Sequence, residues 1–239
     1  MPTPRFAELD WADTPIGLIS LRRRREPTLG VDVFEAKLDD EFLMSSLFTA
    51  AEIELARLGL AAVAGDELDV VVGGLGLGYT ATAVLDDPRV RSLLVVEALP
   101  QVIDWHVREL LPESARLVRD PRVRLLCGDF FAGVASEPGL DPDRAGRRFD
   151  AVLVDIDHTP QHVLATGHAG FYRASGLRRL RRLLRPGGAF GLWSDDPPDP
   201  GFVAVLGSVL DAVEPRVVEF DNPITEGRSA NTVYLARRS

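Results

Sequence analysis

Closely spaced glycines are the residues in this sequence that most directly suggest a ligand site. Four of them lie within residues 73–78, between an apolar stretch and a helix-forming one. Glycine admits positive φ and lets a ligand lie against the main chain, and the following helix presents unpaired N–H groups. Gly74, Gly76 and Gly78 follow G-x-G-x-G, whereas dinucleotide sites use G-x-G-x-x-G. We therefore expect these three glycines to bind an adenosyl ligand without a pyrophosphate; a tight turn with no ligand is the alternative.

Acidic residues end the next two apolar runs, where a bound nucleoside would need hydrogen-bond acceptors. Glu97 follows the glycines by about 20 residues, the spacing at which an acidic residue accepts hydrogen bonds from ribose. We expect Asp129 to accept from the adenine amino group and Phe130 to pack on the adenine ring. The alternatives are a helix N-terminal charge for Glu97, because Pro100 opens a helix, and an N-cap for Asp129.

A third group of polar residues follows the fourth apolar run, at Asp155, Asp157 and His158. Ligands of open α/β sheets bind beyond the carboxyl ends of the strands, so a transferred group would meet its acceptor here. Asp155 is the first catalytic candidate. Asp157 and His158 are next, since either could act as a general base. Capping of the loop by Asp157 is the alternative.

Two adjacent carboxylates, Asp195 and Asp196, end the fifth apolar run. They favour binding of a cationic acceptor such as an amine, although capping explains one of them equally well. Three histidines, His158, His162 and His168, are spaced by four and then six residues across a proline and a glycine. This spacing fits no common metal-ligand pattern, so we expect no metal site.

The elements that position these residues alternate between strand and helix. Continuous apolar runs are typical of strands covered on both faces, and alternation with helices predicts right-handed crossovers and a mainly parallel sheet. Two strands without an intervening helix, at 217–220 and 232–236, predict an antiparallel pair at the sheet's end. The other expected strands are 68–72, 92–96, 123–127, 149–154 and 189–193, and the helices between them are 79–85, 101–111 and 177–184.

The first 48 residues have a different pattern. Residues 16–22 and 31–38 alternate apolar and polar side chains, which predicts strands. A helix is expected over 49–61, with Thr49 as its N-cap and Glu52 completing a capping box. The expected fold is α/β: a Rossmann-like class I methyltransferase fold, with a mostly parallel seven-stranded sheet, preceded by a small β segment. The expected division is an N-terminal β-rich segment, 1–48, and a nucleoside-binding catalytic domain, 49–239.

Composition limits the classes of partner. The 239 residues carry a formal net charge of −9, so a uniform nucleic-acid-binding surface is not expected. A small cationic substrate suits this charge, as does plain solubility. Cys127 is the sole cysteine, so no disulfide can form within the chain. No apolar stretch reaches the roughly 20 residues that span a bilayer. With no signal-like N-terminus, we expect a cytoplasmic protein that does not contact a membrane.

Several segments occur in a distinctive order along the chain. They are 70–79, 94–97, 120–123 with 128–129, 149–155 and 184–188. In this order they resemble the spermidine synthase-like branch of the class I S-adenosylmethionine-dependent methyltransferase superfamily, whose members also have an N-terminal β domain. The resemblance implies that Glu97 binds ribose, that Asp129 binds adenine and that Asp155 lies near an attacking amine. It also implies a homodimer.

Two positions depart from the aminopropyltransferases of that branch. Their glycine loop reads G-G-G-D-G, but Gly76 stands at the position of the aspartate. Their catalytic loop has a second aspartate where this chain has His158, with Asp157 one residue earlier. A loop aspartate would pair with the ammonium of decarboxylated S-adenosylmethionine and repel a carboxylate, so its absence admits ordinary S-adenosylmethionine. Many methyltransferases have an acidic residue two residues before the first glycine of G-x-G-x-G, where this chain has Val72. The methyltransferase signature is therefore incomplete as well.

The function expected from these residues is alkyl transfer, methyl transfer above all, from S-adenosylmethionine to a small acceptor such as an amine. The reaction would be an in-line displacement at a carbon bonded to sulfonium, with Asp155 as the base and His158 or Asp157 assisting. One alternative is a true polyamine aminopropyltransferase that uses decarboxylated S-adenosylmethionine. Another is a catalytically silent nucleoside-binding protein. The glycine spacing argues against an NAD-dependent dehydrogenase.

Overall fold

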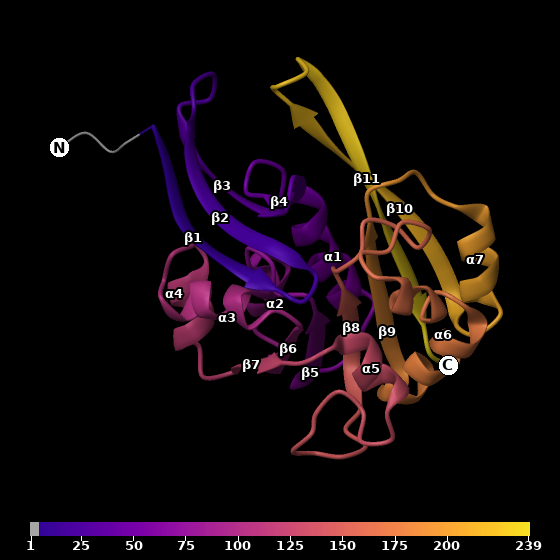
Figure 1. The fold of residues 1–239 in the computed structure, drawn as a ribbon. Coiled ribbons are helices and arrows are strands. Elements are labelled where there is room, and N and C mark those ends of the chain that lie inside the picture. The colour runs from indigo at the N-terminus through magenta and orange to yellow at the C-terminus, as the bar shows by residue number, and fades with distance from the viewer. Residues whose placement is uncertain (1–4) are drawn as a thin grey trace.

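A computed structural model describes residues 5–239, which form two β-sheets joined by a layer of helices (Figure 1). The first sheet is antiparallel and its strands lie in the order of the sequence. It accounts for the β-rich N-terminal segment that the alternating pattern predicted. Its strands are β1 (Phe6–Thr14), β2 (Gly17–Glu26), β3 (Val31–Leu38) and β4 (Glu41–Ser45).

The second sheet has seven strands in the order β10-β11-β9-β8-β5-β6-β7. Its five central strands are parallel, and β10 and β11 form an antiparallel pair that joins them through β9. The predicted α/β fold class is confirmed. The strands are β5 (Leu68–Gly73), β6 (Val90–Glu97), β7 (Val123–Cys127), β8 (Phe149–Val154), β9 (Leu184–Ser194), β10 (Asp211–Asn222) and β11 (Gly227–Arg237).

Helices cover both faces of this sheet. Helices α1 to α4 lie on one face with the N-terminal sheet, and α5 to α7 lie on the other. Successive side chains of β5 alternate between the two cores, with Val70 and Val72 facing the first and Val71 the second. The helices are α1 (Ala50–Ala61), α2 (Tyr79–Leu85), α3 (Pro100–Val107), α4 (Ser114–Arg119), α5 (Phe130–Ala135), α6 (Ala174–Leu183) and α7 (Pro200–Gly207), with a 3₁₀ turn at Thr166–Gly170.

Some boundaries differ from the predicted ones. The helix expected over 101–111 ends at Val107, because Glu109 adopts a left-handed φ of 54° and the Leu110 N–H bonds to the Trp105 carbonyl. Strand β10 extends well beyond the predicted 217–220, and its hairpin with β11 projects past the sheet in Figure 1. Many β10 residues are exposed, so an apolar run could mark only part of the strand.

The N-terminal sheet is fixed to the helical layer by both apolar and polar contacts. Ile19 and Leu21 are fully buried in the core that α1 to α4 share. On β1, Asp10 accepts hydrogen bonds from Trp105 Nε1 and from Arg108, both at 2.9 Å. Both segments therefore contribute to one core. The division into residues 1–48 and 49–239 stays a prediction.

Candidate functional site

The glycine loop lies where the carboxyl ends of three strands meet. The Gly74 N–H donates to the Val96 carbonyl at the end of β6, at 2.9 Å, and the Asp155 N–H donates to the Gly73 carbonyl at 2.8 Å. Gly74, Gly76 and Gly78 have φ values of 91°, 49° and 94°, a region that disfavours other residues. The loop therefore adjoins both predicted carboxylate positions, the ends of β6 and of β8.

Close packing explains some of the glycines without any ligand. A Cβ added to Gly74 would lie 2.0 Å from the Asp155 carbonyl oxygen, and one on Gly78 would lie 2.7 Å from Leu117 Cδ1. At Gly76 the nearest atom is Met44 Sδ, at 3.0 Å. Met44 belongs to β4, so the N-terminal sheet contributes a flexible thioether to the surroundings of the loop.

Glu97 points toward the glycine loop. Its two carboxylate oxygens accept hydrogen bonds from the main-chain N–H groups of Leu75 and Leu99, each at 2.9 Å. Burial raises the pKa of Glu97, and these main-chain donors act in the opposite direction. The residue is 9% exposed. Ribose binding stays a prediction, in which ribose hydroxyls would share the carboxylate with the loop, since each oxygen has a second lone pair.

Asp129 and Phe130 lie at the end of β7 but face different ways. Asp129 is exposed, and it accepts a hydrogen bond from the Ala132 N–H at 3.0 Å as the N-cap of α5. Phe130 is 2% exposed, and its ring lies against Gly73, where a Cβ would come within 2.6 Å of it. Adenine recognition by Asp129 stays a prediction. Stacking of Phe130 on adenine would require the ring to leave the core.

Asp155 lies directly beside the loop and shares its surroundings with a second carboxyl group. Its Oδ2 accepts a hydrogen bond from the Thr80 hydroxyl at 2.6 Å, and that hydroxyl lies 3.2 Å from the main-chain oxygen of Glu52. Burial raises the pKa of Asp155 to about 6. Burial, followed by the charge of Asp155, raises the pKa of Glu52 to about 8. The charge of Asp155 thus disfavours ionisation of Glu52 beside the loop.

Glu52 was not among the candidate site residues. The sequence assigned it to a capping box, but the Thr49 side chain makes no capping hydrogen bond. Glu52 instead follows the buried Ala51 in the first turn of α1, close to Asp155. An acidic residue beside the apolar face of a helix was the signal available in the sequence.

Asp157 is held entirely by the protein. Its side chain is fully buried, and it accepts hydrogen bonds from the Leu164 N–H at 2.7 Å, His168 Nδ1 at 2.8 Å and the Tyr172 hydroxyl at 2.7 Å. Burial, followed by the charge of Asp157, raises the pKa of Tyr172. These bonds organise the loop after β8. A catalytic role for Asp157 stays a prediction, and it would have to compete with three donors.

The remaining candidates lie between the ends of β8 and β9. The His158 carbonyl accepts a hydrogen bond from the Asp195 N–H at 2.8 Å, and the Asp195 carboxylate accepts one from Asn231 at 2.7 Å. Asp195 and Asp196 are exposed. The charge of Asp195 also contributes to raising the pKa of Glu52. The structure thus brings Asp195 near the Glu52–Asp155 pair.

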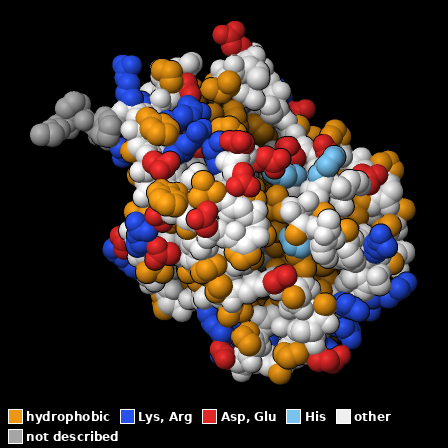
Figure 2. All heavy atoms as spheres, viewed as in Figure 1, with side chains coloured by type: hydrophobic (Ala, Val, Ile, Leu, Met, Phe, Trp, Pro, Cys, Tyr) orange, Lys and Arg blue, Asp and Glu red, His pale blue; other side chains and the backbone are white. Residues whose placement is uncertain are grey.

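Acidic and histidine side chains lie beside one another on the face shown in Figure 2. Asp196 Oδ2 lies 3.9 Å from His162 Nδ1. Within residues 5–239, no three His, Cys, Asp or Glu side chains are arranged to hold a metal ion. In the same part of the chain, every helix is too short or too polar to cross a membrane.

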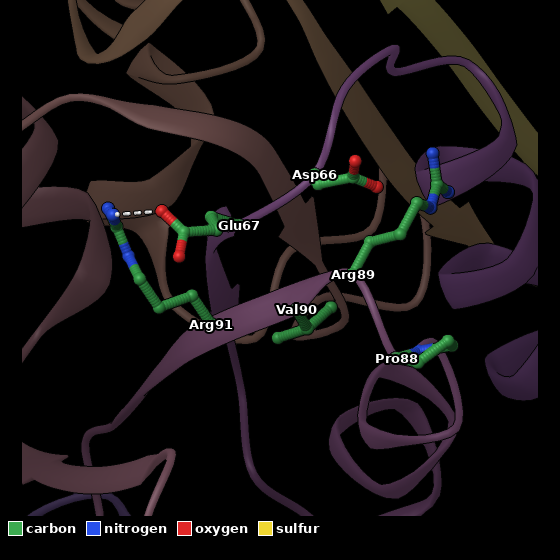
Figure 3. Close-up of a pocket in the computed structure, with 6 residues that line it drawn as sticks. All are labelled: Asp66, Glu67, Pro88, Arg89, Val90 and Arg91. Atoms are coloured by element: carbon green, nitrogen blue, oxygen red, sulfur yellow. Dashed lines mark hydrogen bonds and ion pairs between the residues drawn. The ribbon is translucent and has the colours of Figure 1, made fainter.

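A hollow at the opposite end of the sheet is lined by side chains that bind other parts of the protein (Figure 3). It lies where β5 and β6 begin, away from the glycine loop. Its arginines are already engaged, since Arg91 pairs with Glu67 at 3.4 Å and Arg89 donates to the Leu60 and Val63 carbonyls at 3.0 Å. The residues around it are Asp66, Glu67, Pro88, Arg89, Val90 and Arg91.

Comparisons with known proteins found a partial sequence match and similar folds. No protein-family model matches the sequence. A polyamine aminopropyltransferase of Corynebacterium efficiens is 31% identical over 111 residues, which are 46% of this chain. The match spans only 20% of that relative's length.

Two solved structures have the same overall fold. A spermidine synthase in complex with the transition state analogue AdoDATO superposes with a TM-score of 0.73, at 17% identity, over 97% of this chain and 74% of that one. The spermidine synthase from Thermotoga maritima gives a TM-score of 0.70, at 17% identity, over 97% and 72%. The predicted resemblance is thereby confirmed at the level of the fold: this chain has the spermidine synthase-like form of the Rossmann-type methyltransferase fold.

Proposed function

We propose that this chain is an aminopropyltransferase, which moves the aminopropyl group of decarboxylated S-adenosylmethionine to a small amine. The sequence favoured methyl transfer and gave aminopropyl transfer as an alternative. The alternative has the better support, because the similar proteins are named as a polyamine aminopropyltransferase and spermidine synthases. Nothing in those comparisons supports methyl transfer.

The proposal rests on the pairing of Glu52 with Asp155 beside the glycine loop. Each carboxyl group has a raised pKa because it is buried, and that of Glu52 also because a second carboxylate is near. A bound alkylammonium would relieve this repulsion and return both groups toward their ionised forms. The carboxylate of ordinary S-adenosylmethionine would add a further negative charge, so the pair favours the decarboxylated donor despite Gly76.

The proposed reaction forms a C–N bond and breaks a C–S bond. The lone pair of the acceptor amine attacks the methylene carbon bonded to sulfonium, and the C–S electron pair passes to sulfur, which leaves as a neutral thioether nucleoside. The attacking nitrogen must then lose one proton. Asp155 has a pKa of about 6, so it is largely ionised at neutral pH and can accept that proton. Thr80 fixes its orientation.

The remaining roles complete the proposed site. Gly74, Gly76 and Gly78 would line the donor, with ribose at Glu97, adenine at Asp129 and the cationic acceptor near Asp195 and Asp196. His158 would assist proton removal. A homodimer, a cytoplasmic location and the absence of nucleic-acid binding stay predictions.

Calorimetry and an activity assay would test this proposal together. We expect the protein to bind decarboxylated S-adenosylmethionine more tightly than S-adenosylmethionine. With 1,3-diaminopropane, putrescine or spermidine it should release 5′-methylthioadenosine in equal amount to the extended amine. Asp155→Asn should lower turnover by about 10²-fold or more, and donor binding should weaken because one carboxylate of the pair is lost, but stay measurable. Asp221→Asn is the control, since that side chain is 97% exposed on β10. Methylation of an amine without any 5′-methylthioadenosine release would refute the proposal.

A further inference from the structure

His106 is a fully buried histidine that contacts the glycine loop from α3. Its Nε2 lies 2.9 Å from the Gly76 carbonyl oxygen, and its Nδ1 lies 3.2 Å from the Ser114 hydroxyl at the start of α4. The ring also fills the space next to Gly78, where a Cβ would lie 2.9 Å from His106 Cε1. The imidazole therefore occupies the space between the loop and α4.

The partners of His106 determine its tautomer. A carbonyl oxygen can only accept, so the proton must be on Nε2. Burial lowers the pKa of His106, which keeps the ring neutral and leaves Nδ1 as an acceptor for the Ser114 O–H. The Ser114 oxygen in turn accepts a hydrogen bond from the Leu111 N–H at 3.3 Å. This buried series of bonds gives the ring one orientation and one protonation state.

Together, His106 and Glu97 hold two successive residues of the loop. Glu97 accepts from the Leu75 N–H, and His106 donates to the Gly76 carbonyl. Glycine populates positive and negative φ with similar ease, so nothing in Gly76 itself selects its φ of 49°. The hydrogen bonds at the Leu75 N–H and at the Gly76 carbonyl must therefore select this conformation.

We propose that His106 is a positioning residue for the nucleoside donor, which acts by holding the Gly76 carbonyl and so keeping the glycine loop in its binding conformation. This inference rests on the proposed function. His106 itself does not touch the donor. Without its hydrogen bond, the loop would populate other conformations, and the apparent donor affinity would fall in proportion to the competent fraction. Chemistry at Asp155 in the fully loaded enzyme would be unaffected.

Two substitutions separate the hydrogen bond from packing. His106→Leu places an apolar side chain of similar size in the same space but removes the hydrogen-bond donor. His106→Gln retains an N–H that can reach the Gly76 carbonyl. We expect His106→Leu to raise the donor Kd and KM about tenfold, the effect of losing one good hydrogen bond. The kcat at saturating donor and the acceptor KM should stay within about twofold. His106→Gln should recover most of the donor affinity.

Further measurements keep the inference testable if His106→Leu folds poorly. Ser114→Ala leaves the ring in place but removes the donor to Nδ1, and it should raise the donor KM about threefold. Nitrogen-15 NMR of the wild-type imidazole should show a protonated Nε2 and an unprotonated Nδ1. A protonated Nδ1, equal donor KM values in all variants, or a loss of kcat at unchanged donor KM would each overturn the proposal.

The failure of this inference is distinguishable from the failure of the proposed function. If wild-type protein binds neither nucleoside, aminopropyl transfer is refuted and the donor role of His106 falls with it. Hydrogen exchange of the amides of residues 74–78 then still tests whether His106 stabilises the loop conformation. In His106→Leu these amides should exchange about tenfold faster than in wild type. If wild-type protein binds the donor and His106→Leu binds it equally well, only the positioning role is refuted.

Discussion

The hydroxyl of Thr80 lies 2.6 Å from the carboxylate of Asp155, and this contact joins α2 to the end of β8. Because Thr80 also lies 3.2 Å from the Glu52 main-chain oxygen, its hydroxyl has an acceptor in either state of Asp155. It donates to Asp155 when that group is ionised. When Asp155 is protonated, Thr80 can accept from it and donate to Glu52 instead. The contact thus suits a group that gains and loses a proton during turnover.

Thr80→Val should shift the pH dependence of activity. The hydrogen bond from Thr80 lowers the pKa of Asp155, so its loss should raise that pKa further above its ordinary value. We expect kcat/KM to fall roughly threefold near pH 6.5 and to approach the wild-type value at high pH, where Asp155 is ionised in both proteins. The pH profile of 5′-methylthioadenosine release measures this. Thr82→Val is the matched control, because the buried Thr82 hydroxyl has no hydrogen-bond partner within residues 5–239.

Glu52→Gln should make the unliganded protein more stable at alkaline pH and weaken donor binding. The pKa of Glu52 is about 8 in the folded protein, well above its ordinary value of 4.5. Protonated Glu52 therefore favours folding at low pH, and this stability is lost as pH rises from 4.5 through about 8. Glutamine has no such loss, so the variant should gain on the order of a few kcal/mol near pH 8 and little below pH 4.5.

Urea unfolding at several pH values would measure the effect of Glu52→Gln. Glu54→Gln is the control on the same helix, since that side chain is partly exposed and paired with Arg57. In the same variants, calorimetry should show that only Glu52→Gln loses the preference for the decarboxylated donor. A Glu52→Gln protein that is less stable near pH 8 would show that Glu52 has a favourable partner in the unliganded protein.

Apolar runs were sufficient to predict the central parallel strands β5, β6, β8 and β9, because these strands are largely covered on both faces and need a nearly continuous set of apolar side chains. The end of a strand then locates the residue that follows it. Glu97 and Asp155 were found in this way, and both lie beside the glycine loop.

The sequence indicated which residues follow each strand, but not which way their side chains point. Asp155 and Asp157 both follow β8, which ends at Val154, yet Asp155 accepts a hydrogen bond from Thr80 and Asp157 accepts one from Tyr172. Phe130 follows β7 as predicted but faces the core. Glu52 is distant in sequence from Asp155, and only the packing of α1 brings them together. Beyond the end of a strand, side chains no longer alternate regularly between the two faces, so the spacing of Asp155 and Asp157 does not show which way each side chain points.

Asp157→Asn should destabilise the protein rather than act on the chemical step alone. The carboxylate accepts three hydrogen bonds with no exposed surface, and an amide can replace only part of this pattern. We expect a loss of about 2–4 kcal/mol in the free energy of unfolding, measured by urea denaturation. Tyr172→Phe, which removes one of the three bonds, should cost about 1 kcal/mol. An Asp157→Asn protein of wild-type stability and greatly reduced turnover would instead assign Asp157 to catalysis.

Alanine at Gly76 and at Gly74 should have unequal effects, because different atoms surround the two residues. At Gly76 the added Cβ would lie 3.0 Å from Met44 Sδ, which belongs to a flexible side chain. The main cost there is the positive φ, so we expect Gly76→Ala to lose about 1 kcal/mol of stability. At Gly74 the Cβ would lie 2.0 Å from the Asp155 carbonyl oxygen, which belongs to the main chain and cannot turn aside. Gly74→Ala should therefore cost about 3 kcal/mol or more and displace Asp155, abolishing turnover. Urea denaturation gives the two losses, and similar values would show that the loop moves freely against the end of β8.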